Sequence, residues 1–139
     1  MGKALDYSSA PVGTPPSLMA RLVAIDGSGA PIAGEGNQLL PADVTAITRR
    51  VYDMTTGLLV SQVALTVSSV LAATLTADAA WQSKPFADST GRNFLDRPPG
   101  SNFQVANHVY KVLYTLTTTG GTELDWEYEH TTTSGPPTG

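Results

Sequence analysis

A strict two-residue alternation between Thr122 and His130 is the feature that most restricts how this chain can fold. The even-numbered positions carry mainly apolar and aromatic side chains, namely Leu124, Trp126, Tyr128 and His130. The odd-numbered positions carry the acids Glu123, Asp125, Glu127 and Glu129. Successive side chains of a β-strand point to opposite faces, whereas the 3.6-residue period of a helix would scatter the four carboxylates. The segment therefore predicts a β-strand with one buried face and one acidic, solvated face.

The residues before this strand predict the other half of a β-hairpin. Residues 108–118 place Tyr110, Val112, Tyr114 and Leu116 on one face, and the glycine-rich turn 119–121 reverses the chain. Trp126 and Tyr128 would then form cross-strand pairs with these residues, each contributing about 0.2–1 kcal/mol. We expect these aromatic side chains to belong to the core rather than to a ligand platform.

Further strands are predicted elsewhere in the chain. They are expected at residues 17–26, 44–53, 58–60, 64–76 (one or two strands) and 93–95, with a hairpin turn at 54–57 and a rigid proline loop at 97–101. Residues 76–82 favour a short helix that Asp78 would cap. Many short strands without a long amphipathic helix predict an all-β fold, an antiparallel β-sandwich of immunoglobulin-like or jelly-roll-like type. A small barrel is the alternative.

Composition predicts a single domain with extended ends. The chain has 139 residues, of which 41% are hydrophobic and 14% charged, which suits one core. Residues 1–17 are rich in Pro, Gly and Ser, and residues 131–139 in Thr, Gly and Pro. We therefore expect an N-terminal arm at 1–17, a β-sandwich domain at 18–130 and a C-terminal tail at 131–139, the arms either assisting assembly or folding back on their own domain.

Charge and residue usage exclude several classes of partner. The net charge is −4, and the eight Lys and Arg residues are scattered, so we expect no direct binding of nucleic acid. The absence of Cys removes disulfides and thiolate metal sites. The longest apolar-rich stretch, residues 58–75, is interrupted by polar residues, so we expect no membrane insertion, and the N-terminus shows no export signal.

The acidic face has three interpretations. Its carboxylates are ligands of the kind that Ca²⁺ prefers, although calcium loops curl around the ion and a strand is flat. They are also suited to an electrostatic contact with Arg49 and Arg50, or with basic groups on another subunit. A solvated face that discourages strand-to-strand aggregation is the third interpretation. The candidate interface therefore comprises Glu123, Asp125, Glu127, Glu129, Arg49 and Arg50.

Catalytic residues are few. His108 and His130 are the only histidines and would lie near the open end of the predicted hairpin, where Glu129 makes a metal-dependent hydrolase one hypothesis. No nucleophile elbow, zinc-protease motif or phosphate-binding loop occurs in the sequence. We therefore expect a protein that is not an enzyme, with no catalytic residues, cofactor or metal.

Three segments resemble small uncharacterised proteins that are encoded among the structural genes of tailed bacteriophages and prophages. The resemblance covers roughly residues 18–130 and rests on residues 41–53, residues 88–94 and the hairpin from Tyr110 to Tyr128. It implies a virion protein, such as a capsid decoration or a neck or tail accessory protein. The implied partners are other capsid or tail proteins and further copies of the chain, and the implied location is the virion, after synthesis in the host cytoplasm.

A carbohydrate-binding or receptor-binding β-sandwich module is the alternative function. Such a module would present at least one of Trp81, Phe103 and Trp126 as an exposed platform. An assembly protein would instead cover its exposed apolar groups with neighbouring subunits. The positions of these three side chains therefore discriminate between the two functions.

Overall fold

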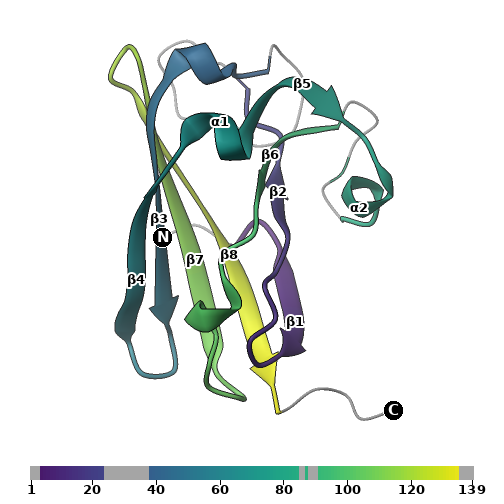
Figure 1. Cartoon of the computed structure of the whole chain (residues 1–139), viewed down its shortest axis with the longest axis vertical. Coiled ribbons are helices and arrows are strands. Elements are labelled where there is room, and N and C mark those ends of the chain that lie inside the picture. Colours follow the sequence, from purple (N-terminus) through teal and green to yellow (C-terminus); the bar gives the residue numbers. More distant parts are fainter. Residues whose placement is uncertain (1–3, 24–37, 85–86, 88–90, 135–139) are drawn as a thin grey trace.

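The computed structural model describes residues 4–23, 38–84, 87 and 91–134. Within these ranges the chain forms two β-sheets that face each other across a shared core (Figure 1). The strands are β1 (Tyr7–Pro11), β2 (Leu18–Ala20), β3 (Val44–Asp53), β4 (Leu58–Leu65), β5 (Leu71–Thr76), β6 (Arg92–Asp96), β7 (Val109–Thr118) and β8 (Glu123–Thr133). The expected all-β class is confirmed.

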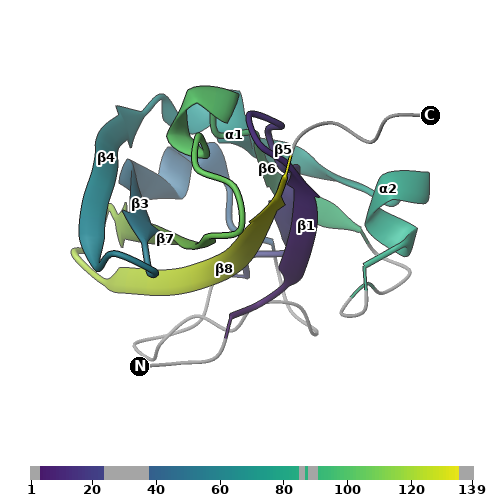
Figure 2. The same cartoon turned by 90° about the horizontal axis from the view of Figure 1, so that it is seen from below.

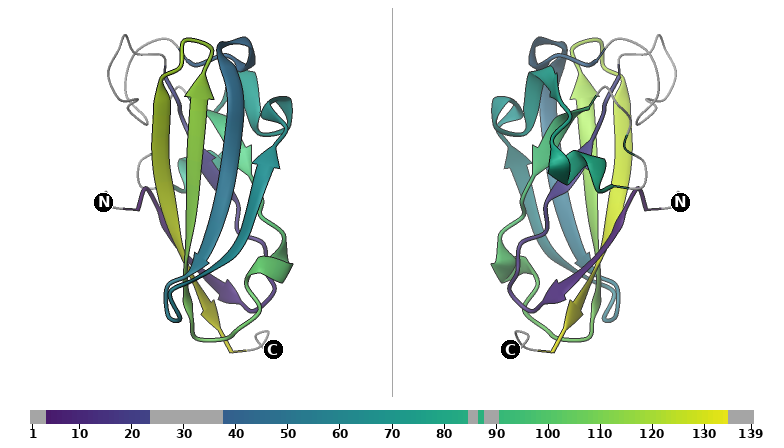
Figure 3. Two further views of the ribbon diagram at one scale, coloured as in Figure 1. Left: turned by 90° about the vertical axis from the view of Figure 1, so that its left-hand side faces the viewer. Right: turned by 90° about the vertical axis from the view of Figure 1, so that its right-hand side faces the viewer.

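The larger sheet contains both predicted hairpins. Its strand order in the described part of the chain is β1-β8-β7-β3-β4, and the four long strands lie side by side in the left view of Figure 3. In the hairpin of β7 and β8, Tyr114 lies opposite Trp126. In the hairpin of β3 and β4, Gly57 has a φ of +80°, a backbone conformation that side chains other than glycine rarely adopt. Both predicted hairpins are confirmed.

The smaller sheet, in the order β2-β6-β5 within the described ranges, covers the inner face of the larger one (Figure 2). Phe94 of β6 packs edge-on against Tyr114 and Trp126, with ring centroids 4.9 and 5.1 Å apart. The Tyr128 hydroxyl donates a 2.6 Å hydrogen bond to the backbone carbonyl of Met19 in β2. The predicted aromatic core is therefore confirmed, and it holds the two sheets together.

Short helices connect the strands. Helix α1 (Val67–Val70) follows β4 and precedes β5, so it carries the chain from the larger sheet to the smaller one within the segment where we expected only strands. Helix α2 (Ala79–Gln82) has the predicted cap, because the Asp78 carboxylate accepts a 2.9 Å hydrogen bond from the Trp81 amide. Single 3₁₀ turns, η1 (Pro41–Asp43) and η2 (Gly100–Asn102), lie before β3 and after β6.

Parts of both expected arms belong to the larger sheet. Within the predicted arm 1–17, β1 pairs in parallel with β8, so residues 7–11 are an edge strand of the larger sheet. At the other end, β8 continues to Thr133, three residues into the predicted tail. A half-exposed edge strand needs no apolar alternation, and for that reason its sequence resembles that of an arm. Residues 1–3, residues 135–139 and the last three residues of the strand expected at 17–26 lie outside the described ranges.

Candidate functional site

The acidic residues lie where the alternation predicts. Glu123, Asp125, Glu127 and Glu129 occupy the outer face of β8, while the intervening side chains are buried. On the neighbouring strand β7, the register places Thr115 opposite Asp125 and Lys111 opposite Glu129. The four carboxylates therefore form a row on the outer surface of the larger sheet, with one end beside a cation.

Arg49 does not belong to this surface, so its assignment to the interface is wrong. It is 5% exposed and lies on the inner face of β3, where its Nη1 donates a 2.8 Å hydrogen bond to Asp96 of β6. Arg50 lies on the outer face but bonds to Gln62 of β4 (3.0 Å) and to Thr115 of β7 (3.4 Å). Neighbouring residues of a strand point to opposite faces, so the two arginines could not both face the carboxylates.

Asp96 is the centre of a buried polar cluster that the sequence did not reveal. Its Oδ2 accepts hydrogen bonds from Arg49 and, at 2.5 Å, from the Tyr114 hydroxyl. Burial and the nearby Asp96 charge raise the pKa of Tyr114 well above its usual value, so the phenol stays protonated and donates. The Arg49 Nε has no hydrogen-bond partner among the described residues. The cluster links the two sheets.

His108, His130 and Glu129 do not converge on one site. His130 is 1% exposed on the inner face, where its Nδ1 lies 2.7 Å from the Ser8 hydroxyl and its ring packs edge-on against Phe103. Burial lowers the pKa of His130. Glu129 occupies the opposite, outer face of the same strand. The three side chains are therefore not placed to bind one metal ion together, as the hydrolase hypothesis requires.

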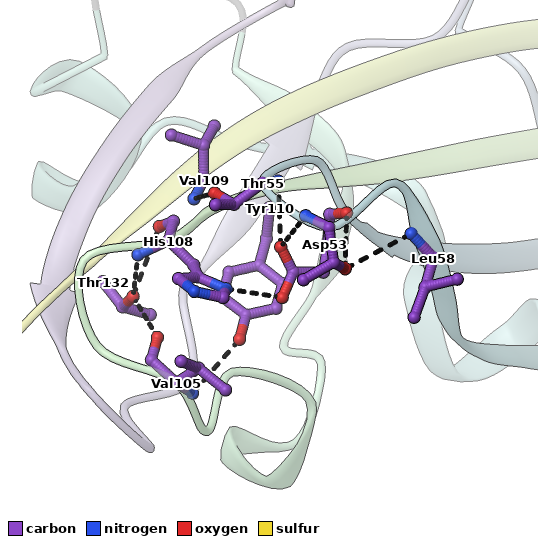
Figure 4. Close-up of polar contacts among 9 residues, drawn as sticks. Asp53, Thr55, Leu58, Val105, His108, Val109, Tyr110 and Thr132 are labelled. Atoms are coloured by element: carbon purple, nitrogen blue, oxygen red, sulfur yellow. Dashed lines mark hydrogen bonds and ion pairs between the residues drawn. The ribbon is translucent and has the colours of Figure 1, made fainter.

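His108 instead takes part in a clamp between two loops (Figure 4). Its Nδ1 donates a 2.6 Å hydrogen bond to the Asp53 carboxylate, which also accepts from the backbone amides of Thr55 and Thr56. Burial acts to raise the pKa of Asp53, but the hydrogen bonds from His108, Thr56 and Thr55 outweigh it and lower the pKa. The Thr132 hydroxyl donates to the Val105 carbonyl at 2.6 Å. The bond from His108 fixes the end of β3 to the loop before β7, and the bond from Thr132 fixes that loop to β8.

Two further findings limit the chemistry of the described residues. Within them, no group of three or more His, Asp or Glu side chains is arranged to hold a metal ion. No helix in the same ranges is long and apolar enough to cross a membrane.

The three aromatic side chains that would identify a glycan platform are buried. Trp81, Phe103 and Trp126 are each at most 4% exposed. Trp126 stacks on Tyr114 with a centroid separation of 5.4 Å, and its Nε1 donates to the Tyr128 hydroxyl. None of the three is available to stack against a sugar.

The exposed apolar surface lies on β4. This strand ends the larger sheet as the structure describes it, and Leu58, Leu59, Val60 and Val63 are 39–65% exposed. A pocket of about 480 Å³ adjoins the C-terminal end of the strand, lined by Ala64 and Leu65 of β4, Ser69 and Val70 of α1, and Leu95 and Asp96 of β6. The sequence offered one signal, since no charged residue occurs between Asp53 and Asp78.

No family model, curated protein or solved structure matches the chain.

Proposed function

We propose that this protein is a non-enzymatic structural component of a tailed-phage virion, a capsid decoration or a neck or tail accessory protein. The resemblance of residues 18–130 to phage structural-gene products gives the biological setting. The β4 edge gives the physical support, because it is a surface suited to being covered by another subunit. Further copies of the chain and other capsid or tail proteins are the partners in this proposal.

The single observation that carries the proposal is the composition of β4. An exposed edge strand offers unpaired backbone N–H and C=O groups, and natural proteins usually protect such strands with charges, proline or a bulge. From Leu58 to Leu65 the strand has no charge and no proline, and its one protective feature is a bulge at Val60, between the pairs Val51–Ser61 and Tyr52–Leu59. An apolar edge of this kind favours aggregation in a free monomer, so we infer that the functional state covers it.

We also infer the finer details of the fold. The facing sheets and their common core support a β-sandwich of immunoglobulin-like or jelly-roll-like type. The segments beyond β1 and β8 would serve as the arms, and β1 itself would anchor the N-terminal one to β8. Such arms add contact area to a small body in a repetitive assembly.

The acidic row on β8 would be a second contact surface in this proposal. A basic patch on a neighbouring virion protein would relieve the repulsion among four adjacent carboxylates and would orient the encounter. Within the described chain, Lys111 meets one end of the row and Arg50 is held by Gln62 and Thr115. The contact therefore requires cations from another protein, and it should weaken as salt is raised.

Quantitative peptide mass spectrometry of purified particles tests the proposal. We expect this chain in many copies per particle, at a fixed ratio to the major capsid or tail protein. A protein that is abundant in infected cells but missing from washed particles would refute the virion role. In that case, binding to a glycan array would test the alternative module, for which the buried Trp81, Phe103 and Trp126 offer no platform.

A further inference from the structure

Strand β4 has two ends of different character. At its N-terminal end, Leu58, Leu59 and Val60 present exposed apolar side chains. At its C-terminal end, Ala64 and Leu65 border the pocket, whose other walls combine the apolar side chains of Val70 and Leu95 with the charged ones of Asp96 and Arg97. One end therefore offers leucine side chains and the other end offers a space of about 480 Å³ beside the sheet.

No strand among the described residues pairs with the outer edge of β4, and such an edge selects an extended strand as its partner. Adding a strand to an open sheet edge supplies backbone hydrogen bonds, while pockets next to the edge supply side-chain selectivity. The incoming strand should be uncharged, because β4 carries no charge to pair with one. It should also be mainly apolar, because the exposed side chains of β4 are apolar except for Gln62.

A second copy of β4 meets these requirements. Antiparallel pairing about a two-fold axis places residue i of one copy against residue j of the other, and j against i. The leucine end of each strand then lies beside the pocket end of its partner. The same contact therefore occurs twice, once at each end of the paired strands. The other terminal strand of the sheet, β1, is shorter and ends in Pro11, which lacks the N–H that pairing requires.

The charge distribution permits this contact. The chain has a net charge of −4, and four of its acids lie on β8. In the strand order β1-β8-β7-β3-β4, two strands separate the acidic row from the β4 edge. Two copies joined at β4 therefore keep their acidic rows apart, and the rows remain open to basic partners.

We propose that two copies of this chain pair antiparallel through β4, which joins their larger sheets edge to edge and seats Leu58 of each copy beside the pocket of the other. The proposal rests on the proposed function only in treating β4 as an assembly edge. A contact made by one strand from each copy is small, so the dimer should be a concentration-dependent equilibrium. Higher salt should not weaken it, since no ion pair holds it together.

Sedimentation velocity over a wide concentration range tests the pairing with a matched pair of variants. Val60→Lys places a charge on the β4 edge, and Val105→Lys places the same charge in the loop before β7, where the native valines are 42% and 47% exposed. We expect the wild type and Val105→Lys to dimerise alike, and Val60→Lys to dimerise at least about tenfold more weakly. Equal melting temperatures of the two variants at low concentration would show that both remain folded.

Cysteine cross-linking tests the geometry, because the natural chain has no cysteine. Gln62 lies near the middle of β4, so in the two-fold arrangement Gln62→Cys of one copy approaches that of the other within disulfide range. We expect mild oxidation to link Gln62→Cys into a covalent dimer and to leave Val105→Cys largely monomeric. Equal cross-linking of the two variants would overturn the proposed axis.

A wild type that stays monomeric at every concentration would overturn the pairing, and so would a Val60→Lys variant that dimerises as well as Val105→Lys. These outcomes are separate from the test of the virion role. A monomer that is abundant in particles would refute β4 pairing and leave the virion role intact. A dimer that is absent from particles would refute the virion role and leave β4 pairing intact.

Discussion

Replacing Asp96 with Asn should destabilise the protein strongly, because it removes the only charge that the described structure places against the buried Arg49 guanidinium. The substitution keeps the size of the side chain, so it creates almost no cavity. The Arg49 Nε already lacks a hydrogen-bond partner in the described ranges, which leaves the guanidinium little other compensation. The loss should therefore be mainly electrostatic.

The size of the effect follows from the burial of the pair. Both side chains are less than one tenth exposed, and breaking a buried pair by removing one partner typically costs about 3–5 kcal/mol. Since the chain has 139 residues, 1 kcal/mol corresponds to about 3–4 °C in the melting temperature. We therefore expect Asp96→Asn to lower the melting temperature by about 9–20 °C.

Thermal unfolding followed by circular dichroism measures this loss, and a double variant tests its cause. Arg49→Met combined with Asp96→Asn removes both charges and keeps an apolar chain of similar length beside Val63 of β4. It should be more stable than Asp96→Asn alone, because the cost comes from an unpaired buried charge. A drop of less than about 3 °C for Asp96→Asn, or a double variant less stable than the single one, would refute this reasoning.

Three other perturbations test separate parts of the structure. Trp126→Ala should lose about 3–5 kcal/mol in unfolding free energy because it empties a site between Phe94 and Tyr114, whereas Tyr7→Ala on the exposed edge should lose little. Burial lowers the pKa of His130, so below about pH 6.5 the unfolded chain binds a proton more readily than the folded chain does. The free energy of unfolding should therefore fall by at most about 1.4 kcal/mol for each pH unit of acidification in this range. The His130→Asn variant should lack this pH dependence. Replacing the acidic residues of the row with Gln or Asn should weaken binding of the protein to washed particles at low salt and leave dimerisation through β4 intact. The residues replaced are Glu123, Asp125, Glu127 and Glu129.

The hairpins were predictable because their information is local. In β7 and β8 the two-residue period continues for most of each strand, and the turn residues between them fix the register that pairs Tyr114 with Trp126. The position of Arg49 could also have been read from its neighbours, since Ile47 and Val51 share its parity and both are buried. Taking Arg49 and Arg50 together as surface charges overlooked that parity.

The remaining features depend on contacts between distant segments. Strand β1 pairs with β8, far along the chain, and its sequence, Tyr-Ser-Ser-Ala-Pro, has no alternation of apolar and polar residues to detect. The partner of Arg49 is Asp96, which lies on the other sheet. The pocket beside β4 is formed by three separate elements. A periodicity within one strand contains no information about such pairings.

Hydrogen exchange of the backbone amides of residues 58–65 tests most directly whether β4 is an assembly edge. In the monomer, the amides of β4 that do not bond to β3 face solvent and should exchange quickly. If β4 is an assembly edge, raising the protein concentration, or binding the protein to its particle, slows exchange in these residues and leaves the exposed loop around Val105 unchanged. Exchange in β4 that stays equally fast in both states would contradict it.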